Sequence, residues 1–392
     1  MTAAREQFTG TDLDEMIAVR RDLHAHPETA FEEVRTSGIV AERLRSLGLE
    51  ARTGIGRTGV MATVKGGRPG KTVLLRADMD ALPIHEENAV PYRSQVHGKM
   101  HACGHDCHTS ILLAISKKLV ADQASLSGTV SLCFQPAEEQ GGGADAMIAD
   151  GAIEQPRPDA AFGLHVWQDL DLGKIGVTTG AFMAAVDEFT VTVKGVGGHA
   201  AMPHASVDPV LCLAHIVTAL QSIASRSVDP LLEVVVSVTQ FHAGAAFNVI
   251  PETAMINGTV RTFDEGVWAL VPGRFEAIVQ GVASAFGCTA ETRFERFHKV
   301  TRNDPAMATI AREVAIEMVG AENVVTDLRT MGGEDFSAFL QRVPGCFIAV
   351  GSRNERRGLV YGHHHPRFDV DEASMKFGAE ILLRTAQRFL AS

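Results

Sequence analysis

The 392-residue chain has few aromatic rings, no long apolar run and no excess of positive charge. With only two Trp and two Tyr, a pocket for an aromatic group would depend on Phe and aliphatic side chains. The formal net charge of -11 argues against a nucleic-acid partner, because phosphate binding needs a basic surface. No apolar run approaches the length needed to span a bilayer, so we expect no membrane partner.

The N-terminal segment MTAAREQFTG lacks a basic stretch followed by an apolar one, so the sequence predicts no secretory signal. Six cysteines are scattered through the chain, which is typical of reduced intracellular thiols and not of a disulfide framework. They are Cys103, Cys107, Cys133, Cys212, Cys288 and Cys346. We therefore expect a cytoplasmic location.

The length exceeds that at which single cores stop growing, so two domains are expected. Apolar, β-branched runs predict strands at Val60–Val64, Thr72–Leu75, Thr129–Phe134, Ala160–Leu164 and, near the C-terminus, Cys346–Val350. Helical spacing predicts helices at Leu13–Leu23, Ser37–Leu47, Thr109–Val120 and Ala144–Ala149. This alternation predicts an α/β domain with a mixed, largely parallel sheet, over residues 1–186 and 297–392.

A different pattern occupies residues 187–296. Strands are predicted at Glu188–Lys194, Leu232–Gln240, Ala254–Arg261 and Thr289–Phe297, and helices at Pro209–Ser225 and Val267–Ala285. This βαββαβ order is typical of a small sandwich with helices on one face. The sequence therefore predicts a smaller, inserted α+β domain.

Potential metal ligands follow the ends of the predicted strands, where the carboxyl ends of a parallel sheet line a crevice. The candidates are Asp78, Asp80, the histidine- and cysteine-containing loop His101–His108, the pair Glu138 and Glu139, His165 and the run His363–His365. Taken singly, each has a structural alternative. An Asp after a strand is more often a turn former, Cys103 is compatible with an inert buried thiol, and the Glu pair with a charged helix start.

The combination of these residues favours a metal centre. Glu138 and Glu139 follow a buried strand and Pro136, where two adjacent carboxylates are unusual unless they are neutralised. One can bind metal while the other takes a proton from water. A mixed set of imidazole, thiolate and carboxylate fits zinc or manganese. Two such ions polarise a scissile carbonyl and generate hydroxide near neutral pH.

Ten segments extend this pattern over almost the whole chain. They are RRDLHAHPE (20–28), RADMDALP (76–83), MHACGHDCHT (100–109), FQPAEE (134–139), GLHVW (163–167), GGHAAMPH (197–204), NVIPE (248–252), GTVRTFD (258–264), MGGEDF (331–336) and HHPRFDVDE (364–372). In this order they resemble the amidohydrolase branch of the dinuclear zinc-exopeptidase (aminoacylase and carboxypeptidase) superfamily. That branch contains hippurate hydrolases, indole-acetyl-amino-acid hydrolases and N-acyl-amino-acid amidohydrolases.

The resemblance implies a set of metal ligands, which are Cys103, His105, Glu139, His165 and His364. It also implies that Glu138 is the general base, which activates water and then passes the proton to the leaving amine. Asp80 would support a neighbouring ligand or the base. Asp78 stands where sister branches place a ligand His, and we expect no coordination by it.

The inserted domain resembles the family's lid and dimerisation domain, which implies a homodimer or a dimer of dimers. His199 would reach the partner subunit's site and stabilise the oxyanion; the alternative is a turn-capping His. Asn248 and Arg261 match positions that hold the substrate carboxylate, although Arg261 is also compatible with an exposed surface residue.

Two departures from the family pattern affect the site. Cys107 stands where the family commonly has a small residue, which raises the possibility of a spare, oxidisable thiol near the metals. His365 replaces an Asn or Ser, so the His363–His365 run offers three imidazoles. The two-residue distance to Pro366 favours His364 as the ligand.

The sequence thus predicts an enzyme, a dinuclear metal-dependent amidohydrolase that cleaves N-acyl amino acids. Zinc or manganese is expected, and cobalt or nickel is compatible. One alternative is a dipeptidase or carboxypeptidase on the same scaffold. Two others are a metal-bound ligand-binding protein without catalysis and a redox-sensing thiol protein built on Cys103 and Cys107.

Overall fold

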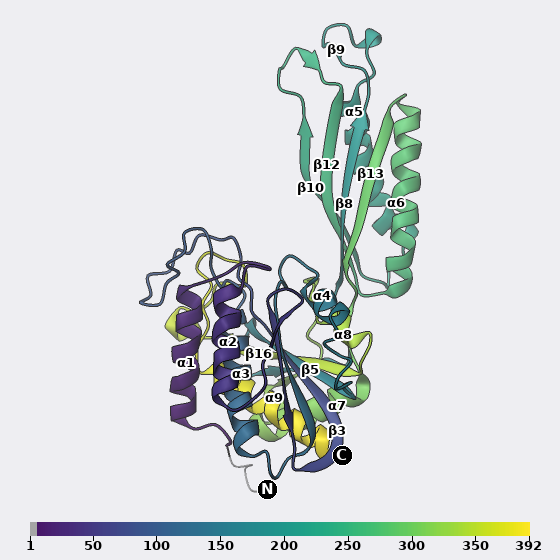
Figure 1. Cartoon of the computed structure of the whole chain (residues 1–392). Helices are drawn as coiled ribbons and strands as arrows, with labels where there is room; N and C mark the ends of the chain where they lie inside the picture. Colours follow the sequence, from purple (N-terminus) through teal and green to yellow (C-terminus); the bar gives the residue numbers. More distant parts are fainter. Residues whose placement is uncertain (1–5) are drawn as a thin grey trace. The chain divides into compact units, whose positions relative to one another are not determined.

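The computed structural model describes residues 6–392, which divide into two compact units (Figure 1). Unit 1 comprises the described residues up to Gly180 together with Arg302–Arg329 and Asp335–Ser392. Unit 2 comprises Ala181–Thr301 and Thr330–Glu334. The predicted boundaries, after residue 186 and before residue 297, therefore fall inside unit 2. The lid and dimerisation role of this segment stays a prediction.

Unit 1 is built on an eight-stranded mixed sheet. Across the sheet the strands are β1 (Arg52–Ile55), β2 (Gly59–Lys65), β4 (Ser127–Gln135), β3 (Arg68–Asp78), β5 (Ala160–Asp171), β16 (Gly345–Arg353), β6 (Ile175–Gly176) and β15 (Val324–Val325). The central strands β4, β3, β5 and β16 run parallel, whereas β1, β2 and β6 pair antiparallel with β2, β4 and β16. The α/β class predicted from the sequence is confirmed.

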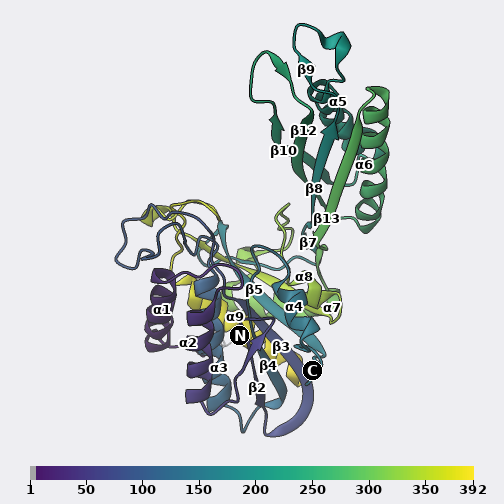
Figure 2. The same cartoon turned by 45° about the horizontal axis from the view of Figure 1, so that its top comes forward.

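Helices cover both faces of this sheet (Figures 1 and 2). The larger core is shared by α1 (Gly10–Ala25), α2 (Val34–Ser46), α3 (His105–Ala121), α7 (Pro305–Val319) and α9 (Ser374–Ala391). Alternate strand residues such as Val73, Leu75, Phe162 and Leu164 face them. The opposite face carries α4 (Gly143–Ala149) and α8 (Ser337–Leu340), where Met147 contacts Cys133. Because side chains alternate along a strand, each strand packs against helices on both faces of the sheet.

Unit 2 has a four-stranded antiparallel sheet in the order β10 (Val234–Ala243), β12 (Thr253–Thr262), β8 (Ala185–Lys194) and β13 (Thr289–His298). Helices α5 (Pro209–Ser222) and α6 (Glu265–Ala285) supply the helical side of its core. Short strands β9 (Gly198–His199) and β11 (Val249–Ile250) pair separately, as do β7 (Gly180–Met183) and β14 (Thr301–Asn303). The βαββαβ order is the one that the hydrophobic pattern indicates.

One stretch departs from the expectation about apolar runs. Pro209–Ser227, which includes α5, is long and apolar enough to cross a membrane by length and composition. Its apolar residues Leu213, Ile216 and Leu220 are fully buried in the core of unit 2. One face of the stretch therefore packs into the core of unit 2, although only 28% of its most apolar window is buried.

Candidate metal centre

The site in unit 1 forms where the parallel strands end and α3 begins. β3 ends at Asp78 and β4 at Gln135, so the segments after both strands emerge at the same edge of the sheet. Gly104 precedes α3 with a φ of 92°, and a Cβ there would lie 2.3 Å from a methyl carbon of Val166. Only glycine fits this turn, which brings the loop carrying Cys103 and His105 onto β5.

Three overlapping groups of ligand atoms link the five predicted metal ligands. Each group has its atoms within 4.8 Å of one another. The groups are Cys103, His105 and His165; Cys103, Glu139 and His364; and His105, Glu138 and Glu139. The structure therefore brings together side chains that lie as far as 261 positions apart in the sequence (Cys103 to His364).

Two buried polar atoms in this cluster lie close to each other and lack hydrogen bonds within the described residues. Nε2 of His105 lies 3.9 Å from Oε1 of Glu139. Among the residues that the structure describes, neither atom has a hydrogen-bond partner, although both are inaccessible to solvent. Unsatisfied buried polar atoms are costly. A divalent cation between an imidazole nitrogen and a carboxylate oxygen would satisfy both, so the donor set fits a metal ion.

The protonation states of the other ligands also suit a cation. Burial, with the negative charge of Glu139, holds the pKa of the Cys103 thiol well above its usual value, so a thiolate needs a cation beside it. Burial and the rings of His108 and His363 hold the pKa of His165 well below its usual value. His165 is therefore a neutral imidazole, the form that binds metal, and its Nε2 lies 3.4 Å from Sγ of Cys103.

Asp80 organises the ligands around it. Its main-chain oxygen lies 2.9 Å from Nδ1 of His105, which makes Nδ1 the protonated nitrogen and leaves Nε2 for a metal. The Asp80 carboxylate accepts hydrogen bonds from the main-chain N–H groups of Glu138 and Glu139, each at 3.0 Å. Asp80 thus supports both a ligand and the predicted base.

Asp78 belongs to a buried network that borders the cluster, with Oδ2 of Asp78 3.6 Å from Nε2 of His105. It lies 2.6 Å from Nη1 of Arg76 and 2.6 Å from Nδ1 of His108. Nε2 of His108 accepts a hydrogen bond from the Val166 N–H at 2.9 Å, so both nitrogens of His108 are occupied. Arg76 also contacts Asp335 at 3.0 Å. This network neutralises Asp78; because Asp78 also groups with His105 and His108 as a possible metal site, its lack of coordination stays a prediction.

The three consecutive histidines have different surroundings. Nε2 of His364 lies 3.2 Å from Oε2 of Glu139, and this contact raises the pKa of His364. The His363 ring donates to the main-chain oxygen of Val166 at 3.0 Å, and the exposed His365 ring stacks on Tyr361. The His363 ring packs edge-on against the ring of His165, whereas His364 is the one of the three that pairs with the carboxylate of Glu139.

Cys107 lies in the interior of unit 1. It is fully buried in the larger core of unit 1. Burial raises the pKa of its thiol well above the usual value. It is therefore a packed core residue with little thiolate character, which does not fit the expectation of an oxidisable spare thiol.

The remaining predicted residues, His199, Asn248 and Arg261, lie in unit 2. His199 is exposed on β9, and its Nδ1 accepts a hydrogen bond from the Ala201 N–H at 3.1 Å, so it does cap a turn. The Asn248 main-chain oxygen accepts from the Ala200 N–H at 3.1 Å, which places Asn248 beside β9. Arg261 is half-buried on β12, and burial lowers its pKa.

Comparison with known proteins identifies the family. The model of Peptidase family M20/M25/M40 matches residues 74–388. The chain belongs to this family. It is 46% identical over 282 residues to an N-acyl-L-amino acid amidohydrolase of Geobacillus stearothermophilus, covering 72% of this chain and 76% of the relative. It is 40% identical to Thermostable carboxypeptidase 2 of Saccharolobus solfataricus, with 93% of each chain covered.

A solved structure agrees with this assignment. A Bacillus subtilis protein, a dinuclear metal binding peptidase from the M20 family, superposes with a TM-score of 0.84 and 34% identity. The comparison covers 98% of this chain and 99% of the other. The predicted resemblance to the amidohydrolase branch and the prediction of an enzyme are therefore confirmed, and the chain is a hydrolase of this family.

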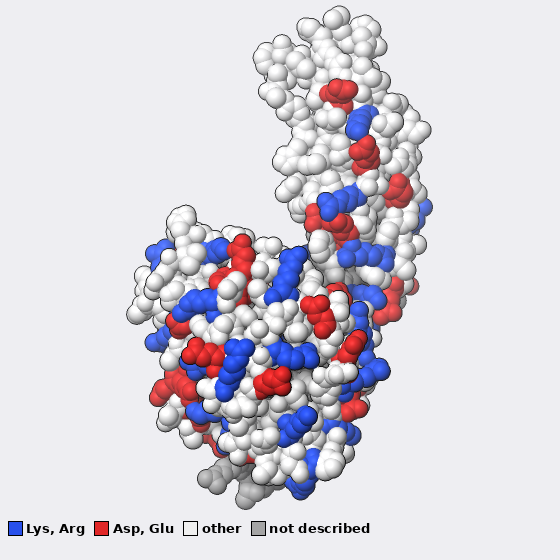
Figure 3. Space-filling model, viewed as in Figure 1, with Lys and Arg blue, Asp and Glu red and all other residues white. Residues whose placement is uncertain are grey.

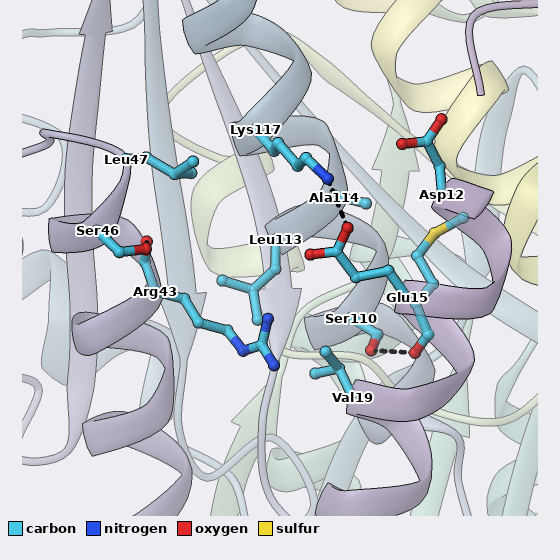
Figure 4. Close-up of a pocket in the computed structure, with 11 residues that line it drawn as sticks. Asp12, Glu15, Val19, Arg43, Ser46, Leu47, Ser110, Leu113, Ala114 and Lys117 are labelled. Carbon is cyan, nitrogen blue, oxygen red and sulfur yellow. Dashed lines mark hydrogen bonds and ion pairs between the residues drawn. The ribbon is translucent and has the colours of Figure 1, made fainter. Parts of the chain in front are cut away.

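A groove outside the candidate site lies between α1, α2 and α3 (Figure 4). Lys117 and Glu15 form an ion pair across it at 2.5 Å, and the Ser110 hydroxyl donates to the main-chain oxygen of Met16 at 2.9 Å. None of its lining residues is a predicted site residue. The groove therefore adds nothing to the chemistry of the metal centre.

Three further residues, which carry no role in the predicted site, are buried near the centre: Arg76, His108 and Glu33. The signal for Arg76 was a charged residue inside an apolar strand, because a buried charge requires partners. His108 lies one helical turn after His105, at the spacing that shares a helix face. Glu33 gives no comparable local signal.

Proposed function

We propose that the chain is a metal-dependent amidohydrolase that cleaves the amide bond of N-acyl amino acids, releasing an amino acid and a carboxylate. The observation that carries the proposal is that His105 Nε2 and Glu139 Oε1, both buried and beside Glu138, have no hydrogen-bond partner in the part of the chain that the structure describes. The N-acyl-L-amino acid amidohydrolase that is 46% identical to this chain supports the substrate class. Acetyl and benzoyl groups, as in hippurate, are the acyl groups to test first.

Cys103, His105, Glu139, His165 and His364 would hold two divalent cations. When bound, such ions act as Lewis acids on the scissile carbonyl and lower the pKa of water. The thiolate ligand favours zinc, and carboxylate and imidazole ligands also accept manganese, cobalt or nickel. We propose the cytoplasm as the location, where such a thiolate stays reduced.

Glu138 would perform the proton transfers. It is 8% exposed, on the turn that follows β4, and its carboxylate lies 3.9 Å from Nε2 of His105. It would accept a proton from the attacking water and deliver that proton to the leaving nitrogen. Asp80 fixes the main chain on both sides of the Glu138–Glu139 peptide, so the base and the neighbouring ligand are oriented together.

Unit 2 would contribute groups for the substrate's charges. Because Nδ1 of His199 accepts from Ala201, the neutral ring carries its proton on Nε2, which is then a donor for an oxyanion. Nη1 of Arg261 is buried and, among the described residues, has no hydrogen-bond partner. A substrate carboxylate would satisfy this guanidinium, and Asn248 would add an amide donor.

We propose that unit 2 also mediates a homodimer, so that His199 serves the partner subunit's site. β10 is an edge strand, and its residues from Thr239 to Ala243 are exposed. The segments 196–207 and 238–251 contain no Lys, Arg, Asp or Glu, and the β9 end of unit 2 is uncharged on the face in Figure 3. Phe247 there is 100% exposed. An exposed apolar edge is typical of a pairing surface.

A second candidate is a carboxypeptidase or dipeptidase, favoured by the 40% identity to the Saccharolobus carboxypeptidase. The two activities break the same kind of bond and differ in the acyl side. Purified chain loaded with zinc or manganese should be assayed on N-acetyl and N-benzoyl amino acids and on dipeptides. We expect a higher kcat/KM on the N-acyl substrates than on the dipeptides. A higher kcat/KM on the dipeptides would show that the chain is a peptidase and not an amidohydrolase.

The catalytic proposal is tested by Glu138→Gln, which keeps the size of the side chain and removes its basicity. We expect kcat to fall at least about 100-fold while metal content stays at the wild-type value. Glu32→Gln, at an exposed carboxylate, is the control and should retain full activity. Equally poor hydrolysis of the whole panel by metal-loaded wild type and Glu138→Gln would refute an enzyme of this class.

A further inference from the structure

Glu33 is a fully buried carboxylate that the predicted chemistry does not use. It lies at the residue before α2, and its exposed fraction is 0%. Burial raises the pKa of its carboxyl. A buried carboxylate is expensive unless its oxygens are satisfied. The partners that satisfy Glu33 therefore indicate what it is there to do.

Those partners connect Glu33 to the turn that carries the base. Oε1 of Glu33 accepts hydrogen bonds from the main-chain N–H groups of Ala137, at 2.9 Å, and of Phe31, at 3.0 Å. Oε2 accepts from the hydroxyl of Thr58 at 2.5 Å. Ala137 lies 104 positions from Glu33 in the sequence and immediately before Glu138. One oxygen of Glu33 thus ties two distant segments of unit 1 together.

Both main-chain donors belong to residues in an unfavourable backbone conformation. Ala137 has a φ of 52° and Phe31 a φ of 62°, in the left-handed region that non-glycine residues rarely adopt. Such a conformation persists only where the surroundings enforce it. The hydrogen bonds to Glu33 fix the peptide N–H groups of these two residues and so help to enforce it.

The turn is held at three consecutive peptide groups. Glu33 accepts from the N–H of Ala137, and Asp80 accepts from those of Glu138 and Glu139. Two buried carboxylates thus fix the main chain through the base and the adjacent ligand. A left-handed residue reverses the local chain direction, so the φ of Ala137 determines where the Glu138 side chain points.

We propose that Glu33 is a positioning residue for Glu138, which it orients for proton transfer by holding Ala137 in the left-handed conformation. The inference rests on the proposed function, because it takes Glu138 as the base. In this role the length of the Glu33 side chain and its acceptor oxygen matter more than its negative charge. Displacing a reacting group by about 1 Å can cost about 100-fold in rate.

Two substitutions at position 33 separate the effect of side-chain length from the effect of charge. Glu33→Gln keeps the length and the Oε1 acceptor, and its amide can donate to Thr58. Glu33→Asp keeps the charge but is one methylene shorter, so it cannot reach the Ala137 N–H. We expect kcat to fall about 10- to 100-fold in Glu33→Asp and to stay within about threefold of wild type in Glu33→Gln. KM and bound metal should be unchanged in both.

The neighbouring Glu32 is the matched control. It is exposed and pairs with Lys99 at 2.6 Å, so Glu32→Asp should leave kcat unchanged. Unchanged kcat in Glu33→Asp would overturn the inference, and so would loss of metal or a greater loss of kcat in Glu33→Gln than in Glu33→Asp. Failure of the proposed function is distinct, because wild type would then be no faster than Glu138→Gln on any N-acyl amino acid.

Discussion

Asp78 lies 2.6 Å from the guanidinium of Arg76, and both side chains are buried in the interior of unit 1. Burial alone would raise the pKa of Asp78, but His105, Arg76 and His108 outweigh it and hold that pKa well below the usual value. Asp78 is therefore ionised and already neutralised by its neighbours. We therefore expect Asp78 to remain outside the coordination of the proposed metal centre.

Asp78→Ala should accordingly damage stability more than metal binding. Removing the carboxylate takes one of two carboxylate partners from the buried Arg76, which keeps Asp335, so the loss should be at most about 3–5 kcal/mol. Urea unfolding measures the loss, and elemental analysis of the folded fraction should still give the wild-type metal content. His105→Ala is the comparison that should lose metal. A variant of normal stability that has lost one ion would make Asp78 a ligand.

Removal of metal should destabilise unit 1. Ions that bind only the folded state raise stability by about 2.7 kcal/mol at a concentration 100 times the Kd. A chelator should therefore lower Tm, and zinc or manganese should restore it. His364→Ala should reduce this increase in Tm, because His364 contacts Glu139 at 3.2 Å.

His365→Ala is a closely matched control for that experiment, because the adjacent ring stacks on Tyr361 and makes no contact with Glu139 that the structure describes. It should respond to metal as wild type does. If His365→Ala lost the metal-dependent increase in Tm and His364→Ala kept it, the assignment within the three histidines would be wrong.

Asp187 should make the stability of unit 2 depend on pH. Burial raises the pKa of Asp187 to about 6, against about 3.9 in an unfolded chain. Between these values the folded state binds more protons than the unfolded state, so stability falls as pH rises from about 4 to about 6 and stays low above. Asp187→Asn removes this penalty and should gain stability relative to wild type as pH rises.

Trp268 provides the measurement, because its Nε1 donates to Asp187 at 3.0 Å and the chain has only two Trp. Denaturant unfolding, followed by Trp fluorescence, gives the difference in stability between Asp187→Asn and wild type at pH 4 and at pH 8. The same difference between variant and wild type at both pH values would contradict the raised pKa.

The proposed dimer should be sensitive to charge on one edge of unit 2. Phe241, 43% exposed on β10, and Phe297, 39% exposed on β13, lie on opposite edge strands of the same sheet. Phe241→Glu should convert the dimer to monomer, whereas Phe297→Glu should not. Light scattering on both variants and wild type measures the mass. A monomeric wild type, or a dimer unaffected by Phe241→Glu, would exclude pairing through β10.

Much of the fold could be predicted from the sequence because its signals are local. The apolar run Thr72–Leu75 lies inside β3, and the helical spacing of Val267–Ala285 coincides with α6. The strand-end rule also predicts Asp80 and Glu138 at one edge of the sheet, and the hydrogen bond from the Glu138 N–H to Asp80 agrees with it. Periodicity and strand order are thus enough to locate the candidate site.

The hydrogen bonds that orient the site could not be predicted in this way. The link from Glu33 to Ala137 spans 104 positions, and no periodicity connects them. The left-handed φ of Ala137 has no sequence signal either, because glycine is the residue that normally marks it. Sequence patterns indicate which faces are buried, whereas the partners of buried polar groups emerge only from tertiary packing.

The connectivity of unit 1 has a consequence for biosynthesis. α9 packs against β3, β5 and β16, although unit 2 is encoded between β5 and α9. During translation the inserted unit therefore leaves the ribosome complete, while its host still lacks a helix that covers the central strands. We expect nascent chains to contain a folded insert beside an unfinished sheet, whose exposed apolar face is a natural target for chaperones.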